Sequence, residues 1–407
     1  MRIALLNSVC YGSTGKIARG IASHVRAAGG EARVYYGRGS SFGDTDAVRI
    51  ESNAEVYAHL ACARLSDRQG FYSKMATKRL IRALAAFDPD VVHLHNLHGY
   101  WLDMETLFPF LAAFQKPVVW TLHDCWPFTG HCAYFDAANC MRWQTGCYAC
   151  PKRSEYPQSL LLDRSARNYM DKKRLFTAVP NMTFVTPSQW LAERVGDSFL
   201  RAYPACVLPN GIDLTVFRPT ESALRERYGL VGKRLLLGVA QVWEPRKGMD
   251  MLLQLRKRLP TEYAMALIGL NGEQMEQLPA GVLGLPRTKD AAELAAWYTA
   301  ADVLVDCTCE ENFPTTHLEA LACGTPVATF AAGGSAEMLT ETCGVGVPVG
   351  DLEALRLAVD QATTLRGADC LAQARRYDTN ERLAAYLPLY EELLGKAGAK
   401  SMGEKRI

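Results

Sequence analysis

The stretch Asp306–Pro326, DCTCEENFPTTHLEALACGTP, lies between two short apolar segments, ADVLVD and PVATF. Continuous apolar runs of this length are typical of strands buried on both faces of a parallel sheet. Pro314 suits the first position of a helix, and Gly324 suits the left-handed residue that ends one. The stretch therefore predicts a strand, a loop, a helix and a second strand, which together form one βαβ unit of an α/β fold.

Three carboxylates lie in this stretch, at Glu310 and Glu311 in the loop and at Glu319 on the helix. A single glutamate in such a place is usually a solvated surface residue, so the argument depends on the whole string. Glu311 and Glu319 are separated by seven residues, with Phe313-Pro314 between them and LEALACGTPV around and after Glu319. This string resembles the E-x7-E signature of retaining glycosyltransferases of family 4.

Length and composition describe a two-domain protein. A chain of 407 residues exceeds what one core usually serves. Its 45 basic and 43 acidic residues give a net charge of +2, which argues against a nucleic-acid-binding protein. No apolar run has the length of a membrane span. The apolar start of the chain leads directly into a glycine loop and does not resemble a signal peptide, so we expect a cytoplasmic protein.

The first glycine loop follows RIALLN and opens an amphipathic segment. Its GSTGK string lacks the earlier glycine of a Walker A loop, which would fall at Cys10. Gly12 and Gly15 allow either a close backbone approach to a ligand or a plain tight turn, and the residues leave both alternatives open.

Polar side chains end two further apolar segments. The segment VVHLHN ends in His95 and Asn96, and PVVWTLHD ends in His123 and Asp124. Because the carboxyl ends of parallel strands meet at one edge of a sheet, we expect these side chains to lie together. A lone histidine is more often a packing residue than a catalyst. The TLHD ending resembles the family's acceptor-side strand, which implies that His123 lies beside the donor sugar and that His95 and Asn96 are on the acceptor side.

Several of the thirteen cysteines crowd into the segment 125–151. The spacing C-x7-C-x6-C-x2-C is formed by Cys132, Cys140, Cys147 and Cys150. Four thiolates suit a tetrahedral structural zinc, and a C-x2-C pair supplies two ligands from one turn. Reduced thiols or a disulfide are the alternative, an iron–sulfur cluster is disfavoured, and nothing indicates a catalytic metal.

The segment 160–176 is predicted to be a helix with many cations. Its basic residues are Arg164, Arg167, Lys172, Lys173 and Arg174. Such a face either contacts anionic lipid or a lipid diphosphate, or is a solvated surface, which is the more common outcome. Peripheral contact with the inner membrane surface is therefore one alternative.

A second apolar strand, RLLLGVAQV, precedes WEPRKGMDMLLQL, so Arg246 and Lys247 are predicted between a strand's carboxyl end and a helix. A nucleotide diphosphate is strongly negative and suits an arginine fork beside a lysine point charge.

The turn at Pro209-Asn210-Gly211 marks the domain boundary. We expect an N-terminal domain over 1–207, a donor-binding domain over 208–380, a helix over 381–398 that returns to the first domain, and a disordered tail over 399–407.

The resemblance covers almost the whole chain and implies two Rossmann-like domains facing across a cleft, the glycosyltransferase-B fold. It implies retaining, metal-independent transfer of a hexose-type sugar from a nucleotide-diphosphate sugar to a hydroxyl of a growing glycan or lipid-linked oligosaccharide, in exopolysaccharide, capsule or lipopolysaccharide assembly. In this reading Arg246 and Lys247 contact the leaving diphosphate, Glu311 the sugar and Glu319 the ribose diol. The implied catalytic residues are His123, Glu311, Arg246 and Lys247. The implied donor-binding residues are Gly12, Gly15, Arg246, Lys247, Glu311, Asn312, Phe313, Pro314, Thr315, Thr316 and Glu319.

The cysteine-rich insert departs from the general family pattern and resembles one found in a subset of polysaccharide-assembly members. Two rival hypotheses stay open. One is a sugar-nucleotide epimerase or phosphorylase of the same fold, and the other is a nucleotide-sugar-binding regulatory protein without turnover. The regulatory reading is disfavoured because both carboxylates and both cations are present together.

Overall fold

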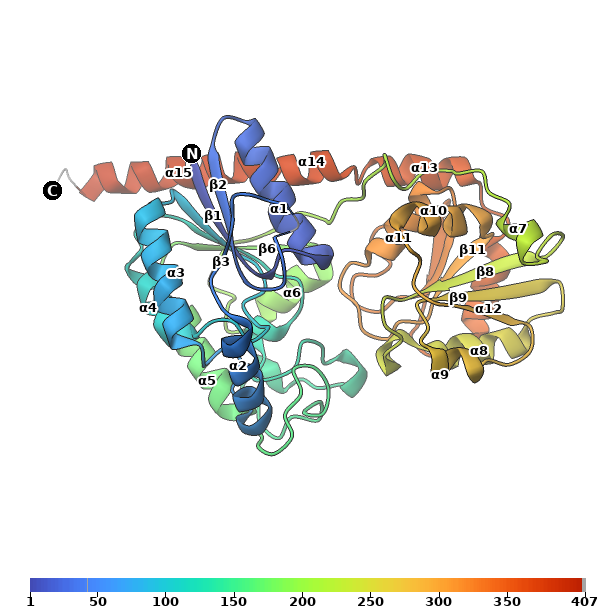
Figure 1. Ribbon diagram of the computed structural model, residues 1–407, viewed down its shortest axis with the longest axis horizontal. Helices are drawn as coiled ribbons and strands as arrows, with labels where there is room; N and C mark the ends of the chain where they lie inside the picture. Colours follow the sequence, from blue (N-terminus) through green and yellow to red (C-terminus); the bar gives the residue numbers. More distant parts are fainter. Residues whose placement is uncertain (42, 405–407) are drawn as a thin grey trace. The chain divides into compact units, whose positions relative to one another are not determined.

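The computed structural model describes residues 1–41 and 43–404, with side chains through 397. The chain divides into two compact units (Figure 1). Unit 1 contains Met1–Leu208 and the chain from Leu383 onward, and unit 2 contains Pro209–Arg382. Each unit holds a parallel sheet with helices between its strands, so the predicted α/β class is confirmed.

Unit 1 contains, within the described residues, a seven-stranded sheet in the order β3-β2-β1-β4-β5-β6-β7. Its strands are β1 Arg2–Val9, β2 Glu31–Arg38, β3 Ala47–Arg49, β4 Val91–Leu94, β5 Val118–Thr121, β6 Met182–Thr186 and β7 Ala205–Val207. Its helices are α1 Gly12–Ala27, α2 Asn53–Ser66, α3 Lys74–Phe87, α4 Met104–Ala113, α5 Ser165–Phe176, α6 Gln189–Asp197 and α15 Tyr386–Glu404. Every strand pair is parallel, and the strand order reverses between β1 and β4.

Unit 2 contains a six-stranded parallel sheet in the order β10-β9-β8-β11-β12-β13, again counted over the described residues. Its strands are β8 Arg234–Val239, β9 Tyr263–Ile268, β10 Val282–Leu285, β11 Val303–Asp306, β12 Val327–Phe330 and β13 Gly344–Val347. Its helices are α7 Leu224–Arg227, α8 Met249–Arg258, α9 Gly272–Glu276, α10 Ala291–Ala300, α11 Thr315–Ala322, α12 Leu352–Ala362 and α13 Gly367–Arg375, and α14 Thr379–Ala384 leads out of the unit.

The βαβ unit predicted from Asp306–Pro326 is confirmed as β11, α11 and β12, and β11 pairs with β12 in parallel. Gly324 has a φ of +82° just beyond the helix, as predicted. Pro314 differs from the prediction, because it precedes the helix in extended conformation, with φ −71° and ψ 122°. Proline has no N–H to lose at either position, so its φ alone does not distinguish them.

The cation-rich helix is shorter than predicted. It begins at Ser165, because the Asp163 carboxylate accepts hydrogen bonds from the Ser165 backbone N and hydroxyl and turns the chain there. Residues 160–164 therefore form a loop.

The C-terminal segment of 381–398 is two helices, α14 and α15, and α15 continues to Glu404. The structure therefore continues α15 through 399–404, where a disordered tail was expected, and 405–407 lie outside the described residues. Tyr386 and Tyr390 are buried in the core of unit 1, and their hydroxyls bond Thr121 and His93. Among the described residues, no helix combines the length and apolar composition needed to cross a bilayer.

Candidate active site

The site in unit 2 lies where the strand order reverses, between β8 and β11. Ligands of open α/β sheets bind outside the carboxyl ends of strands at such a switch point. Gly248 has a φ of +67°, and a Cβ there would lie 2.2 Å from the carbonyl oxygen of Cys307. The Cys309 N–H also donates to the Arg246 carbonyl at 2.8 Å. The loops after β8 and β11 are thereby joined at backbone level.

Two cations meet one carboxylate at this junction. The Lys247 Nζ donates to Glu311 Oε2 at 2.6 Å, and the Arg246 Nη1 lies 3.9 Å from the same oxygen. Arg246 also donates to the Glu310 carbonyl at 3.1 Å and to Glu244 Oε2 at 3.1 Å. The side chains of Arg246, Lys247 and Glu311 are 26%, 20% and 14% exposed, so a ligand can reach all three.

The charge balance keeps Glu311 ionised. Burial raises the pKa of Glu311, but the nearby Lys247 and Arg246 cations outweigh it and hold the pKa below its usual range. An ionised carboxylate accepts hydrogen bonds only, which suits sugar hydroxyls. Glu310, the other glutamate of the loop, is buried next to Glu311 in the chain.

A hydrogen-bonded pair of side chains, Asp306 and His317, lies close to this junction and was missed by the sequence analysis. Asp306 ends β11, and its Oδ2 lies 2.9 Å from the His317 Nε2 on α11, while the other ring nitrogen lies 3.0 Å from the Ser335 carbonyl. Burial raises the pKa of Asp306, but His317, Lys247 and Thr308 together hold it well below its usual range. Asp306 stands at a strand's carboxyl end, which is the signal that could have identified it.

The side chain of Glu319 accepts a hydrogen bond from the neighbouring helix, α10. The buried Tyr298 hydroxyl of α10 donates to Glu319 Oε2 at 2.8 Å. Burial and the adjacent Glu319 raise the pKa of Tyr298 well above its usual value, so it stays a donor. One carboxylate oxygen is thereby oriented by the protein.

The other predicted donor-binding residues of this loop differ in exposure. Asn312, Phe313 and Pro314 are buried, and the Phe313 ring centroid lies 5.9 Å from that of Tyr377. Thr315 and Thr316, at the start of α11, are half-buried. Of these five residues, only the two in the first turn of α11 are accessible, and the backbone N–H groups at a helix N-terminus favour an anion.

In unit 1, the structure brings His95 and His123 together at the ends of β4 and β5. Their Nδ1 and Nε2 atoms are 3.0 Å apart and the rings are stacked. Burial lowers the pKa of His123 to about 4, since the opposing effect of Asp124 is smaller. Asn96 joins this edge through its N–H, which donates to Asn7 Oδ1 at 3.1 Å.

A hydrogen-bonded chain beside these histidines was not anticipated. Asp124 Oδ2 lies 2.8 Å from the His98 Nε2, and the His98 Nδ1 lies 2.8 Å from the Tyr156 hydroxyl. Tyr156 comes from the far end of the cysteine-rich region, so its nearness to His98 could not be read from spacing.

The structure accounts differently for the two glycines of the first loop, Gly12 and Gly15. A Cβ at Gly15 would lie 2.4 Å from the backbone carbon of Cys10, so α1 packs on the end of β1 only with glycine there. Gly12 opens α1 with a φ of +66° and open space around it. Packing accounts for Gly15, and ligand contact by either glycine stays a prediction.

The four spaced cysteines line one small cavity of about 10 Å³, together with His131 and Trp143. The Cys147 Sγ accepts from the Gly130 N–H at 3.2 Å. Over the described part of the chain, no group of three or more histidine, cysteine or acidic side chains is arranged to hold a metal ion. The thiols thus gather as predicted, but not in ligating geometry, and structural zinc stays a prediction.

The position of Lys172 shows that the cations of α5 do not form one exposed basic face. It is buried, and its Nζ donates to the carbonyls of Trp126 at 2.7 Å and Thr129 at 3.1 Å. Its Nζ also lies 3.4 Å from the centroid of the Trp126 ring. Lys172 therefore braces the cysteine-rich insert and faces neither solvent nor lipid.

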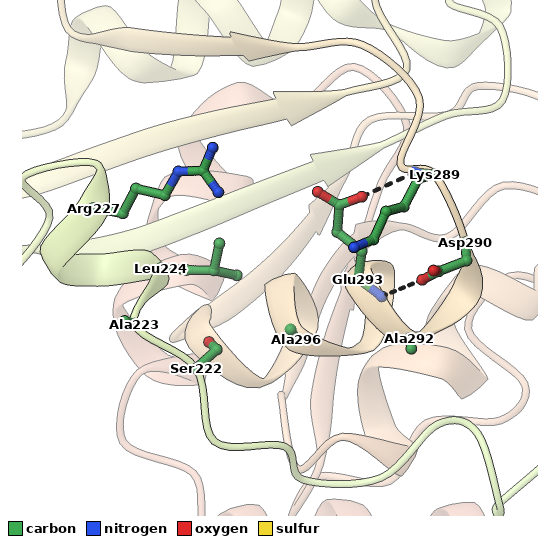
Figure 2. Close-up of a pocket in the computed structure, with 9 residues that line it drawn as sticks. All are labelled: Ser222, Ala223, Leu224, Arg227, Lys289, Asp290, Ala292, Glu293 and Ala296. Atoms are coloured by element: carbon green, nitrogen blue, oxygen red, sulfur yellow. Dashed lines mark hydrogen bonds between the residues drawn. The ribbon is translucent and has the colours of Figure 1, made fainter.

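One hollow of unit 2 lies elsewhere, between α7 and the start of α10 (Figure 2). Its volume is about 340 Å³, and none of the predicted site residues line it. Asp290 and Glu293 there accept hydrogen bonds from the backbone N–H groups of Glu293 and Lys289. These contacts cap α10, so we assign the hollow no part in the site.

Comparison with known proteins gives a consistent result. A family model described as Glycosyltransferase Family 4 matches residues 15–216, and one described as Glycosyl transferases group 1 matches residues 233–364. The colanic acid biosynthesis glycosyl transferase WcaC of Escherichia coli (strain K12) is 29% identical over 360 residues, which cover 83% of this chain and 84% of WcaC.

Solved structures share the fold. Sucrose-phosphate synthase from Thermosynechococcus elongatus has a TM-score of 0.67 at 18% identity, covering 97% of this chain and 99% of that one. Anabaena HepE, solved in complex with UDP, has a TM-score of 0.65 at 17% identity, covering 95% and 100%. The two parallel α/β units and these solved neighbours show the glycosyltransferase-B fold. Within that class, the chain belongs to glycosyltransferase family 4.

Proposed function

We propose that this glycosyltransferase uses a nucleotide-diphosphate sugar and transfers a hexose-type sugar with retention of anomeric configuration. The observation that carries the proposal is the meeting of Arg246, Lys247 and Glu311 at the switch point of unit 2. HepE, which shares the fold, was solved with UDP, and this supports a nucleoside diphosphate as the leaving group.

The chemistry requires stabilisation of a growing negative charge. As the bond between the sugar and the diphosphate breaks, the sugar becomes cationic and the diphosphate gains charge. Arg246, Lys247 and the N-terminus of α11 supply fixed positive charge at that place, which is the usual means of stabilising such a transition state. The proposed mechanism routes no step through a metal ion, because these groups supply the charge.

The carboxylates bind the two sugars of the donor. Glu311, ionised and reachable, accepts hydrogen bonds from hydroxyls of the transferred sugar, and Glu319, oriented by Tyr298, accepts them from the ribose diol. His123 is the candidate sugar contact in unit 1. Burial keeps it neutral near neutral pH, so it can donate or accept a single hydrogen bond.

The proposed acceptor is a hydroxyl of a growing glycan or lipid-linked oligosaccharide in extracellular polysaccharide assembly. The similarity to a glycosyl transferase named for colanic acid biosynthesis favours this class.

A panel of nucleotide sugars tests the proposal. We expect release of nucleoside diphosphate with one donor, slow with water and faster with an acceptor glycan, insensitive to EDTA, and with retained configuration by NMR. Nucleotide-sugar binding without release would support the regulatory alternative, and interconversion of donors without release would support an epimerase.

A further inference from the structure

Helix α2 has an apolar outer face. Its exposed side chains include Tyr57, Ala58, Ala61 and Leu65, and Tyr57 and Leu65 are 68% and 50% exposed. A surface helix normally turns polar residues outward and apolar residues inward. The helix carries only two charged residues, Glu55 at its start and Arg64 near its end. This pattern leaves an apolar stripe that the described part of unit 1 does not bury.

Three consecutive leucines continue this face. Leu160, Leu161 and Leu162 are 52%, 64% and 43% exposed. The Leu160 N–H donates to the Arg64 carbonyl at 2.7 Å, which places the leucine loop at the C-terminal end of α2 (Figure 1, α2 in dark blue and the loop in green). We call Tyr57, Ala58, Ala61, Leu65 and Leu160–Leu162 the α2 surface.

The leucine loop is held in place by its backbone. The buried Ser159 hydroxyl lies within hydrogen-bond reach of the Leu162 and Arg64 carbonyls, at 2.6 and 3.4 Å. The Arg153 guanidinium donates to the Leu161 carbonyl at 3.2 Å. Polar contacts therefore hold three leucines in exposed positions at the end of α2, and clustered exposed apolar side chains are typical of interaction sites.

The charge around the α2 surface favours an anionic partner. Arg64 contacts the leucine loop through its carbonyl, and Arg153 contacts it through its guanidinium. The side chain of Arg167 on the following helix is 63% exposed and lies 3.5 Å from Asp171. The acids next to the loop also have partners, since Glu155 pairs with Lys152 at 2.9 Å and Asp163 accepts bonds from Ser165. A twofold contact between two copies of this surface would bring the same arginines against each other. A tyrosine among leucines, bordered by arginine, is the composition of proteins that sit at a membrane interface.

We propose that the α2 surface docks on the interfacial region of a bilayer containing anionic lipid, with Leu160–Leu162 entering the headgroup layer. This goes beyond the proposed reaction, because it concerns where the protein binds and needs no turnover. It also differs from the lipid-facing alternative raised for the basic segment 160–176, because Lys172 of that segment is buried.

Vesicle binding tests the proposal with the full chain. We expect sedimentation with vesicles of phosphatidylethanolamine and phosphatidylglycerol in equal parts, and weaker sedimentation with phosphatidylcholine alone or at high salt. The variant Leu160→Ser/Leu161→Ser/Leu162→Ser should partition at least about tenfold more weakly. The matched control is Val231→Ser/Val242→Ser/Leu357→Ser in unit 2, whose side chains are 65%, 61% and 55% exposed; it should bind like the wild type.

Three outcomes would overturn the proposal: no vesicle binding by the wild type, equal loss in both triple variants, or unchanged binding of the leucine variant. If the wild type does not bind vesicles but forms a dimer that the leucine variant does not form, the α2 surface is a contact between two copies of the chain instead. Thermal unfolding of each variant confirms that exposed substitutions leave the fold intact. Because vesicle binding is independent of turnover, its failure is distinguishable from failure of the donor assay.

Discussion

The Lys247 Nζ and the Glu311 Oε2 are 2.6 Å apart, although the two residues are 64 positions apart in the sequence. They come from the loops after β8 and β11, which the switch in strand order makes neighbours. Without a ligand the two charges compensate each other. When a donor binds, Lys247 would contact its diphosphate and Glu311 would accept hydrogen bonds from its sugar hydroxyls. The contact between Lys247 and Glu311 therefore connects the two halves of the proposed donor site.

Removing both cations should abolish donor binding. For Arg246→Ala/Lys247→Ala we expect UDP or the active nucleoside diphosphate to bind at least about 100-fold more weakly by calorimetry, because hydrogen bonds to charged groups are worth about 1.5–3 kcal/mol each. The control is Lys257→Ala/Arg258→Ala, an exposed basic pair at the end of α8. Unchanged affinity in the first variant would refute the assignment of the diphosphate site.

Glu319 should recognise the ribose. The wild type should bind the ribonucleoside diphosphate about tenfold more tightly than its 2′-deoxy analogue, since a site that pairs with a hydroxyl rejects ligands lacking it. Glu319→Ala should bind the two with similar affinity. Tyr298→Phe, which removes the 2.8 Å contact that orients Glu319, should show an intermediate preference. Full discrimination in Glu319→Ala would place the ribose elsewhere.

Asp306 should stabilise unit 2 in a pH-dependent way. Its folded pKa is depressed below the unfolded value, so its contribution is present above the unfolded pKa of about 3.9 and is lost as pH falls toward the folded value. Asp306→Asn should therefore lower the free energy of unfolding by about 1–3 kcal/mol near neutral pH. In urea unfolding, the difference from wild type should shrink below about pH 4. A constant difference across pH would contradict a depressed pKa of Asp306 in the folded protein.

His123 should contribute with the same proton preference as Asp306, because folding favours the deprotonated form of each side chain. Its folded pKa of about 4 is below the ordinary value, so the neutral form is stabilised; this contribution is full above about pH 6.5 and is lost as pH falls toward 4. His123→Gln should reduce the rise in unfolding free energy between these values by on the order of 2 kcal/mol. The transferase rate should show no step near pH 6.5 from this residue. A titration of His123 by NMR near its ordinary pKa would disprove its burial as a neutral ring.

The cysteine-rich insert can be tested for zinc directly. If the four thiols close on a metal, elemental analysis of the purified protein should find about one zinc per chain, and Cys147→Ser should lose it. The control is Cys62→Ser, an exposed cysteine outside the insert. Absence of zinc, with all four thiols reactive toward a thiol reagent after unfolding, would establish reduced cysteines instead.

Much of the fold could be predicted from local pattern. Short valine-rich runs predicted buried parallel strands, and β11, α11 and β12 follow the prediction from Asp306–Pro326 closely. The spacing of Glu311 and Glu319, and the cations after β8, were found because each lies within one strand-loop-helix unit. Such signals depend on residues within about twenty positions of each other.

Other contacts were beyond local pattern. From the sequence, Lys172 is predicted to be one of several surface cations in a basic segment. In the structure it is buried against Trp126 and donates hydrogen bonds to two carbonyls of the insert. Tyr156 reads as part of a loop, yet its hydroxyl lies 2.8 Å from His98. Burial and partner are set by elements far away in the chain, and no periodicity carries that information.

The sequence by itself determined the α/β class, the family and the pair of cations and carboxylates at strand ends, because these depend on composition and spacing within single units. Only the tertiary structure decided that Lys247 meets Glu311, that Asp306 pairs with His317, that Lys172 faces inward, and that the leucines at 160–162 continue an apolar helix face. The physical reason is that strand order and packing choose which distant segments become neighbours, and the pKa and exposure of a side chain follow from those neighbours.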